Sequence, residues 1–162
     1  MNLSNQGGLK ILKKLNTPAK IQDFLEKIPV NFEKRGETCR SPLGVLRHRE
    51  AHCLEGAIFA AACLRLNGRK PLILDLSAHR HDLDHVIAVF KVNNHWGAIS
   101  KTNHAVLRYR EPVYRSIREL VMSYFHEYFL DNGKKTLRSY SQPVDLSKFD
   151  KKSWITAKDD VW

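Results

Sequence analysis

Apolar residues in the first part of the chain recur at helical spacing. Thr17 and Pro18 mark a helix start, because threonine caps helices and proline suits the first turn. The apolar positions behind them lie on one helix face and are Ile21, Phe24, Leu25 and Ile28. Pro29 ends this helix, and Ser41-Pro42 is a second start signal. We expect the polar residues 2–8 to be frayed.

The most apolar segment of the chain runs from Cys53 to Asn67. It has almost no polar face, since its apolar members are Leu54, Ala57, Ile58, Ala60, Ala61, Ala62, Leu64 and Leu66. A helix that is apolar all round is buried on most sides. Asn67-Gly68 supplies its C-terminal stop. The sequence therefore predicts a buried helix with a cysteine at its start.

Strand patterns follow this helix. Residues 71–76 are rich in β-formers, and residues 77–84 form a polar loop. Residues 85–92 read HVIAVFKV, a nearly continuous apolar run that is typical of a central strand. Asn93-Asn94 indicates a hairpin turn, and residues 96–100 return as the partner strand.

Ser116 and Glu119 form a capping box that marks the start of a last helix, and Asn132-Gly133 marks its end. Its aromatic stripe is expected to be core rather than a binding surface and consists of Tyr124, Phe125, Tyr128 and Phe129. Residues 134–162 are expected to form an irregular tail over the domain. The whole predicts one α+β domain, residues 1–162, with N-terminal helices in 1–39, a core in about 40–103 and an antiparallel sheet.

Composition agrees with one globular domain: the chain has 162 residues, of which 43% are hydrophobic. No apolar run approaches the roughly 18 residues that a membrane-spanning helix needs. The first 14 residues also lack the apolar segment of a signal peptide. We therefore expect a cytoplasmic protein with no membrane partner.

The formal net charge is +10. The excess lies in residues 1–50 and 101–162, while residues 51–100 are nearly neutral. Basic flanks can bind an acidic partner. Nucleic-acid binding is not expected as the main function, because no basic stripe with interleaved aromatic residues is present.

The three cysteines are too few for a disulfide framework. Cys53 is the candidate nucleophile, since the positive end of a helix dipole and its free N–H groups stabilise a thiolate. The competing interpretation is an inert cysteine at a helix start. Cys63 lies among alanines and leucines and is expected to be packing, and Cys39 is expected to be structural or incidental.

His85 opens the predicted central strand and can reach a helix N-terminus that packs on the same sheet, as a general base for Cys53. A capped surface histidine is the alternative. The side chains of the preceding loop could instead ligate a metal together with His85, and they are His79, His81, Asp82 and Asp84. The spacing is not a standard zinc pattern, and we expect no metal or other cofactor.

The order of these parts resembles the core of the transglutaminase-like superfamily, a branch of the papain-like cysteine hydrolases. In that family a Cys opens an alanine-rich helix that ends near a Gly, and a His lies inside a later hydrophobic strand. A Trp then precedes an Asp by a few residues. The matching segments here are Cys53–Ala57, Asn67-Gly68, Asp84–Val89 and His95–Ser100. The resemblance covers about residues 40–103.

The resemblance implies that the Cys53 thiolate attacks an amide or ester carbonyl and that His85 is the general base. In the family an Asp orients this His, and that position falls on Ser100 here. Ala51-His52 also stands where the family often has a small G-x-C-like turn. Some members of the superfamily bind calcium, but no dense carboxylate loop indicates that here.

The register of the hairpin decides which residue orients His85. A two-residue turn pairs Val92 with His95 and brings Ser100 to the same face as His85. A three-residue turn pairs Val92 with Trp96 and places Asn103 opposite His85, as an asparagine orients the histidine in papain-like enzymes. The alignment with the family through Trp96 favours Ser100, whereas the chemistry favours Asn103, whose amide oxygen is the better fixed acceptor for an imidazole N–H. Both are candidates for the residue that orients His85, with a slight preference for Ser100.

The sequence therefore predicts a thiol-dependent amide or ester hydrolase or acyltransferase that acts on a peptide or protein substrate. The alternative is a non-catalytic member of the same fold that serves as a binding module for an acidic protein or nucleic acid.

Overall fold

A computed structural model describes residues 4–34, 36–158 and 160–161. It is a mixed helix and sheet fold in which four helices precede the first strand. The helices are α1 (Asn5–Lys14), α2 (Pro18–Lys27), α3 (Pro42–His48), α4 (Cys53–Leu66) and α5 (Ile117–Phe125), with short 3-10 helices at Ala105–Leu107 and Leu146–Lys152. The strands are β1 (Leu72–Ala78), β2 (His85–Val92), β3 (His95–Ile99), β4 (Arg110–Tyr114), β5 (Leu137–Tyr140) and β6 (Val144–Asp145).

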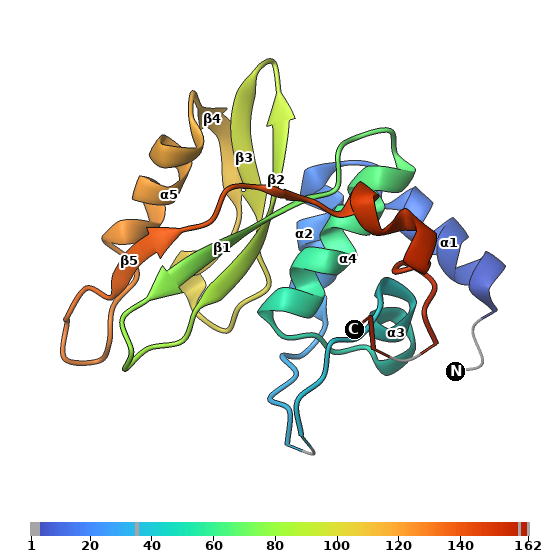
Figure 1. Ribbon diagram of the computed structural model, residues 1–162, viewed down its shortest axis with the longest axis horizontal. Coiled ribbons are helices and arrows are strands. Elements are labelled where there is room, and N and C mark those ends of the chain that lie inside the picture. Colours follow the sequence, from blue (N-terminus) through green and yellow to red (C-terminus); the bar gives the residue numbers. More distant parts are fainter. Residues whose placement is uncertain (1–3, 35, 159, 162) are drawn as a thin grey trace.

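The six strands form one antiparallel sheet in the order β4-β3-β2-β1-β5, and β6 also pairs with β1. Helices cover both faces of this sheet: α5 lies on one side and α1 to α4 gather on the other (Figure 1). The predicted mixed fold with an antiparallel sheet is thus confirmed.

The central strand β2 serves two hydrophobic cores. Ala88 and Phe90 belong to the core that contains α4, while Ile87 and Val89 belong to the core that contains α5. This alternation follows from the two-residue period of a strand. It explains the continuous apolar run, because both faces of β2 are covered.

The start of α4 is set by local chemistry. His52 occupies the N-cap, and its backbone N–H donates to the Glu55 carboxylate at 3.1 Å, which is half of a capping box. Alanine fills the middle of the helix, so α4 can be buried between the other helices and the sheet. The buried helix with Cys53 as its first residue is confirmed.

The turn between β2 and β3 has two residues, Asn93 and Asn94, both at positive φ. Val92 pairs with His95, so the structure has the two-residue register and not the three-residue one. Asparagine tolerates this backbone region better than most residues, which favours the tight turn. In this register Ser100 follows the end of β3 on the same face of the sheet as His85.

Three expectations are wrong in whole or in part. Within residues 2–8, Asn5–Gly8 are helical rather than frayed, because Ser4 caps α1 by accepting a hydrogen bond from the Gly7 N–H; residues 1–3 lie outside the described part. The last helix ends at Phe125 and not near Asn132-Gly133; Tyr124 and Tyr128 are core as expected, but Phe129 is 47% exposed. The tail packs over the domain as expected, since Trp154 is buried, but it is not wholly irregular, because β5 and β6 pair with β1.

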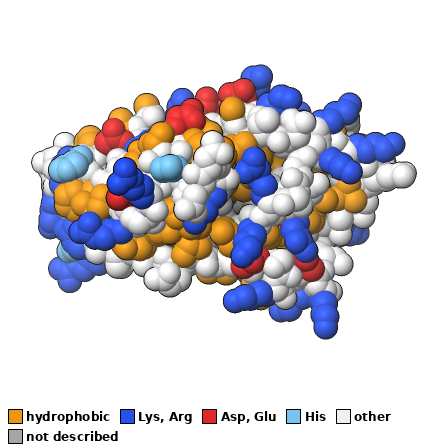
Figure 2. Space-filling model, turned by 90° about the horizontal axis from the view of Figure 1, so that it is seen from above, with side chains coloured by type: hydrophobic (Ala, Val, Ile, Leu, Met, Phe, Trp, Pro, Cys, Tyr) orange, Lys and Arg blue, Asp and Glu red, His pale blue; other side chains and the backbone are white. Residues whose placement is uncertain are grey.

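Basic side chains are distributed widely over the surface. Figure 2 shows Lys and Arg across much of the face seen, interspersed with acidic and apolar side chains and not gathered in one stripe. In the described residues, no helix has both the length and the apolarity to cross a membrane.

Candidate active site

Cys53 opens onto a cavity of about 470 Å³ at the end of the sheet. His52 and His85 line the same cavity, as do Ser100's neighbours Lys101, Thr102 and Asn103. The walls come from segments far apart in the sequence: residues 30–33, 82–85, 101–107 and 127–129. The thiol is therefore placed where a small molecule or a peptide segment can reach it.

His85 is oriented by Ser100. The Ser100 hydroxyl donates to the backbone carbonyl of Leu107 at 2.6 Å, which leaves its oxygen to accept from His85 Nε2 at 2.7 Å. All of these groups are buried. The proton of the neutral ring is therefore on Nε2, and Nδ1 is the nitrogen left for the hydrogen bond with the Cys53 thiol.

Ser100 itself is held by Gln22 of α2. The Gln22 amide donates to the Ser100 carbonyl at 2.9 Å and accepts from the Ser100 N–H at 2.9 Å. This pair of hydrogen bonds replaces a neighbouring strand at the point where β3 ends. Gln22 is 5% exposed, and its role in fixing Ser100 cannot be read from the sequence around it.

A close approach of α4 to the end of β3 brings the two halves of the site together. A Cβ atom placed on Gly56 would lie 2.3 Å from Lys101 Cβ, so only glycine fits there. Lys101 is buried and its ammonium group donates to the carbonyls of Leu25 and Ile28 at the end of α2. Because Lys101 directly follows Ser100, this contact sets the position of Ser100 relative to Cys53.

His52 is a second imidazole beside the thiol. Its Nε2 donates to the Thr38 carbonyl at 2.9 Å, and its ring also hydrogen bonds to Cys53. The sequence pattern gives His52 no role in activating the thiol. The signal that could have found it is the N-cap position, where the side chain turns back over the first turn of the helix.

The electrostatics favour a thiolate at Cys53. Burial alone would raise the pKa of the thiol, but hydrogen bonds from His52 and His85 and from the Val86 N–H outweigh it. The pKa of Cys53 is lowered to about 6. For His52, burial opposes protonation, and the contacts with Cys53, the Thr38 carbonyl and Glu55 raise its pKa to about 9. Near neutral pH the pair is thus a thiolate and an imidazolium.

The other candidates are placed differently. Asn103 lines the cavity, but the group that hydrogen bonds to His85 is Ser100. Burial raises the pKa of the Cys63 thiol, and burial together with nearby carboxylates raises that of Cys39 to about 11. Neither thiol is activated as Cys53 is.

The loop before β2 makes structural contacts. Asp84 accepts from the Ala78 N–H at the end of β1, and Asp82 accepts from Thr136. Across residues 4–34, 36–158 and 160–161, no three His, Cys, Asp or Glu side chains are grouped as a metal site would require. The alternative of a metal held by His79, His81 and His85 is therefore not formed.

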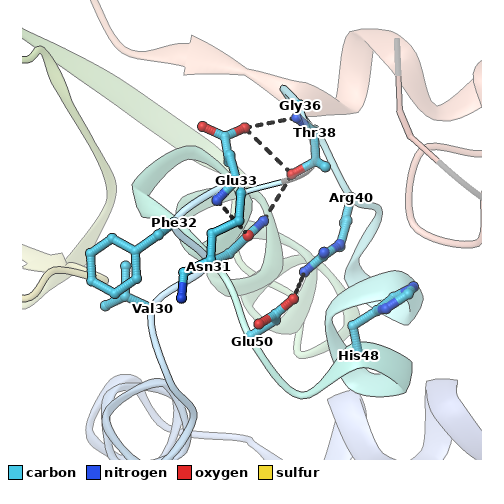
Figure 3. Close-up of a pocket in the computed structure, with 10 residues that line it drawn as sticks. Val30, Asn31, Phe32, Glu33, Gly36, Thr38, Arg40, His48 and Glu50 are labelled. Carbon is cyan, nitrogen blue, oxygen red and sulfur yellow. Dashed lines mark hydrogen bonds and ion pairs between the residues drawn. The ribbon is translucent and has the colours of Figure 1, made fainter.

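A second cavity, of about 650 Å³, lies on the other side of residues 30–33. Figure 3 shows its lining, in which Glu33 contacts Thr38 and Arg40 pairs with Glu50. Glu33 and Thr38, which line this cavity, also contact His52, through the Glu33 carboxylate and the Thr38 carbonyl.

No protein-family model matches the sequence, and a search of curated proteins finds no similar sequence. The functional assignment therefore rests on the geometry of the site.

Proposed function

We propose that the protein is a thiol-dependent amide or ester hydrolase or acyltransferase of the transglutaminase-like type. One observation carries the proposal: the Cys53 thiol contacts two imidazoles, those of His52 and His85, at the wall of an open cavity. Thiolates, not thiols, are the nucleophiles of such enzymes. The order of a Cys at a helix start, a His at a strand start and its partner after the next strand supports the superfamily assignment.

The reaction begins with attack of Cys53 Sγ on the carbonyl carbon of the substrate. A carbon–sulfur bond forms, and the oxygen that becomes negative is within the field of the first N–H groups of α4. When the intermediate collapses, the carbon–nitrogen or carbon–oxygen bond breaks, and the leaving group takes a proton from an imidazolium beside the thiol. The product of this half-reaction is an acyl-enzyme.

The second half-reaction restores the thiolate. Water or an amine attacks the acyl-enzyme carbonyl while His85 Nδ1 accepts its proton. The carbon–sulfur bond breaks, the acyl group leaves as an acid or an amide, and Cys53 returns to the thiolate with the proton on imidazole. Ser100 keeps the His85 ring in the tautomer that this step needs, because its oxygen accepts the Nε2 proton.

The mouth of the cavity supports a substrate with a large apolar group. Phe32, Leu83 and Phe129 line it and are 66%, 84% and 47% exposed. They come from three separate loops, and Leu83 is held in place because its carbonyl accepts from the Tyr128 hydroxyl. Large side chains exposed together around a concave site are typical of ligand recognition. An acyl group with an aromatic or branched side chain fits this mouth.

Trapping of the acyl-enzyme tests the proposal. The full chain is mixed with the p-nitrophenyl ester of an N-acetylated phenylalanine, and the protein is digested for mass spectrometry. We expect acylation on the peptide that contains Cys53, and none in the Cys53→Ala variant. Absence of both acylation and turnover in the folded wild-type protein, with amide and ester substrates alike, would leave the protein as a non-catalytic binding module.

A further inference from the structure

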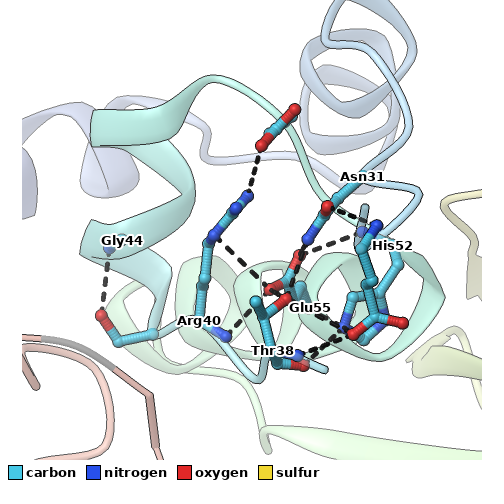
Figure 4. Close-up of polar contacts among 9 residues, drawn as sticks. Asn31, Thr38, Arg40, Gly44, His52 and Glu55 are labelled. Carbon is cyan, nitrogen blue, oxygen red and sulfur yellow. Dashed lines mark hydrogen bonds and ion pairs between the residues drawn. The ribbon is translucent and has the colours of Figure 1, made fainter. Parts of the chain in front are cut away.

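Glu55, two residues after the nucleophile, is a carboxylate with no exposed surface. Its oxygens accept hydrogen bonds from four groups, which are Asn31 Nδ2, Thr38 Oγ1 and the backbone N–H groups of Arg40 and His52, at 2.8 to 3.2 Å. Figure 4 shows these donors converging on Glu55 from the 31–40 loop and the start of α4. Four hydrogen-bond donors hold this carboxylate in place and favour its ionised form.

His52 lies against this carboxylate. Its Nε2 is 3.7 Å from an oxygen of Glu55 and 3.7 Å from an oxygen of Glu33, and it donates to the Thr38 carbonyl. Thr38 therefore contacts both His52 and Glu55, so the imidazole and the carboxylate are held by the same loop. Two carboxylates beside one ring nitrogen favour the charged form of the ring.

The two imidazoles next to Cys53 have different partners. His85 meets a neutral hydroxyl at Nε2, whereas the Nε2 of His52 meets a carbonyl and two carboxylates. A hydroxyl orients an imidazole but stabilises its positive charge less than a carboxylate does. The positive charge that a thiolate requires therefore resides more favourably on His52 than on His85.

We propose that His52 and Glu55 form a positioning pair that holds Cys53 as a thiolate, which leaves His85 free to accept the proton of the attacking water or amine. The pair would compensate for the hydroxyl of Ser100 in the place where the superfamily has a carboxylate. This inference rests on the proposed thiol chemistry and assigns the resting charge of that site to two residues.

Other charged and titratable groups around the pair agree with this assignment. On the far side of Glu55, Arg40 Nε is 3.9 Å away, but the same guanidinium also pairs with Glu50 at 3.0 Å. The Cys39 thiol, near Glu55 and Glu33, has its pKa raised to about 11 and is neutral. Tyr128, which is near Cys53, has its pKa raised by burial and is neutral too. The net charge that faces His52 is thus negative.

The pKa values of Glu55 and His52 are shifted in the directions that their contacts require. The pKa of Glu55 is lowered, because hydrogen bonds from Arg40 and Thr38 and the charge of His52 outweigh its burial. The raised pKa of His52 has a contribution from Glu55 in turn. Each group therefore stabilises the charge of the other.

The pH dependence of Cys53 alkylation tests the pair without any substrate. Glu55→Gln keeps the shape of the side chain and removes its charge, and His52→Gln removes the imidazole. In both variants we expect the pKa of Cys53 to rise by about one unit or more, which reduces the alkylation rate at pH 6 by about fivefold or more. Glu50→Gln is the matched control, since that carboxylate pairs with Arg40 and not with His52.

Folding of each variant is checked by circular dichroism, because a merely structural role for Glu55 would lower stability without moving a thiol pKa. His52 is partly exposed, so His52→Gln remains informative even where Glu55→Gln does not fold. A folded His52→Gln variant with the wild-type alkylation profile would overturn the inference. A low thiol pKa in the wild type with no acylation would instead refute the proposed function and leave the positioning pair intact.

Discussion

Replacement of Gly56 by alanine is the smallest change that should pull the candidate site apart. The added methyl group would lie 2.3 Å from Lys101 Cβ and 3.0 Å from Lys101 Cγ. Ordinary carbon contacts are about 3.5 to 4.0 Å, so α4 and the segment after β3 must separate by about 1 Å or more. Lys101 cannot rotate out of the way, because its Cβ is fixed by the backbone and its ammonium group caps α2.

The expected cost follows from two opposing effects. Overpacking of a filled interior costs about 1–3 kcal/mol. Alanine stabilises a helix interior by about 1 kcal/mol relative to glycine, although Gly56 is in the first turn, where this gain is smaller. We therefore expect a net loss of about 1–2 kcal/mol in the free energy of unfolding. The same separation moves Ser100 and His85 away from Cys53, so the pKa of the thiol should rise.

Denaturant unfolding followed by circular dichroism measures the stability, and the alkylation rate of Cys53 measures the thiol. A double-mutant cycle with Lys101→Gly isolates the contact, since that change removes the Cβ that the new methyl group meets. The double variant should be more stable than the sum of the two single effects predicts. If Gly56→Ala is as stable as the wild type and keeps the low thiol pKa, the close approach does not position the site as described.

Three further predictions concern the chemistry of the site. Ser100→Ala leaves the buried Nε2–H of His85 without its acceptor, so turnover of an activated ester should fall by at least tenfold, whereas Asn103→Ala should have little effect; equal losses, or none from Ser100→Ala, would contradict the orienting role. The raised pKa of His52 contributes stability that is present below its unfolded value of 6.5 and lost as pH rises through about 9, and the lowered pKa of Cys53 contributes stability that is present above 9.0 and lost as pH falls through about 6. These two trends offset each other, because the proton moves from the thiol to the imidazole within the protein. The difference in unfolding free energy between wild type and a His52→Gln/Cys53→Ala variant should therefore stay constant from pH 7 to 8.5. A slope of this difference near one proton, about 1.4 kcal/mol per pH unit, would refute the ion pair. Leu83→Ser at the mouth should raise KM for the phenylalanyl ester several-fold with kcat unchanged, while Val113→Ser, at an exposed apolar residue that does not line the cavity, should change neither. An unchanged KM in Leu83→Ser would exclude the mouth from substrate binding.

The parts of the site that lie on strongly patterned elements could be predicted from the sequence. The apolar residues of α4 and the N-cap position place Cys53 at a buried helix start. The apolar run of β2 and the Asn93-Asn94 turn determine where His85 and Ser100 lie on neighbouring strands. These are local signals, since each depends on periodicity or on turn residues within one segment.

The parts that depend on contacts between distant segments could not be predicted. Gln22 and Ser100 are 78 residues apart and meet only because α2 packs beside the end of β3. From the sequence, Glu55 would be an ordinary charged residue in the first turn of a helix. Its burial results from the 31–40 loop, which folds over it. No local pattern carries such information.

The edge strands β4 and β5 could not be predicted from the sequence either. In β5 only Leu137 is buried, and β4 contains a proline and alternates between exposed and half-buried residues. Such segments lack an apolar pattern, because their order comes from hydrogen bonds to strands that are already formed. Phe129 shows the opposite error, since its helical spacing indicated core, but the helix ends four residues before it.

Alkylation of Cys53 by iodoacetamide as a function of pH shows whether this thiol is ionised at neutral pH, as the proposed chemistry requires. The rate is measured on the folded full chain by mass spectrometry, with Cys39 and Cys63 in the same molecule as internal controls. We expect a half-maximal rate for Cys53 near pH 6, with little reaction at Cys39 and none at the buried Cys63. A half-maximal rate at Cys53 near pH 8.5 to 9, the range of an ordinary thiol, would show that Cys53 is not a thiolate at neutral pH.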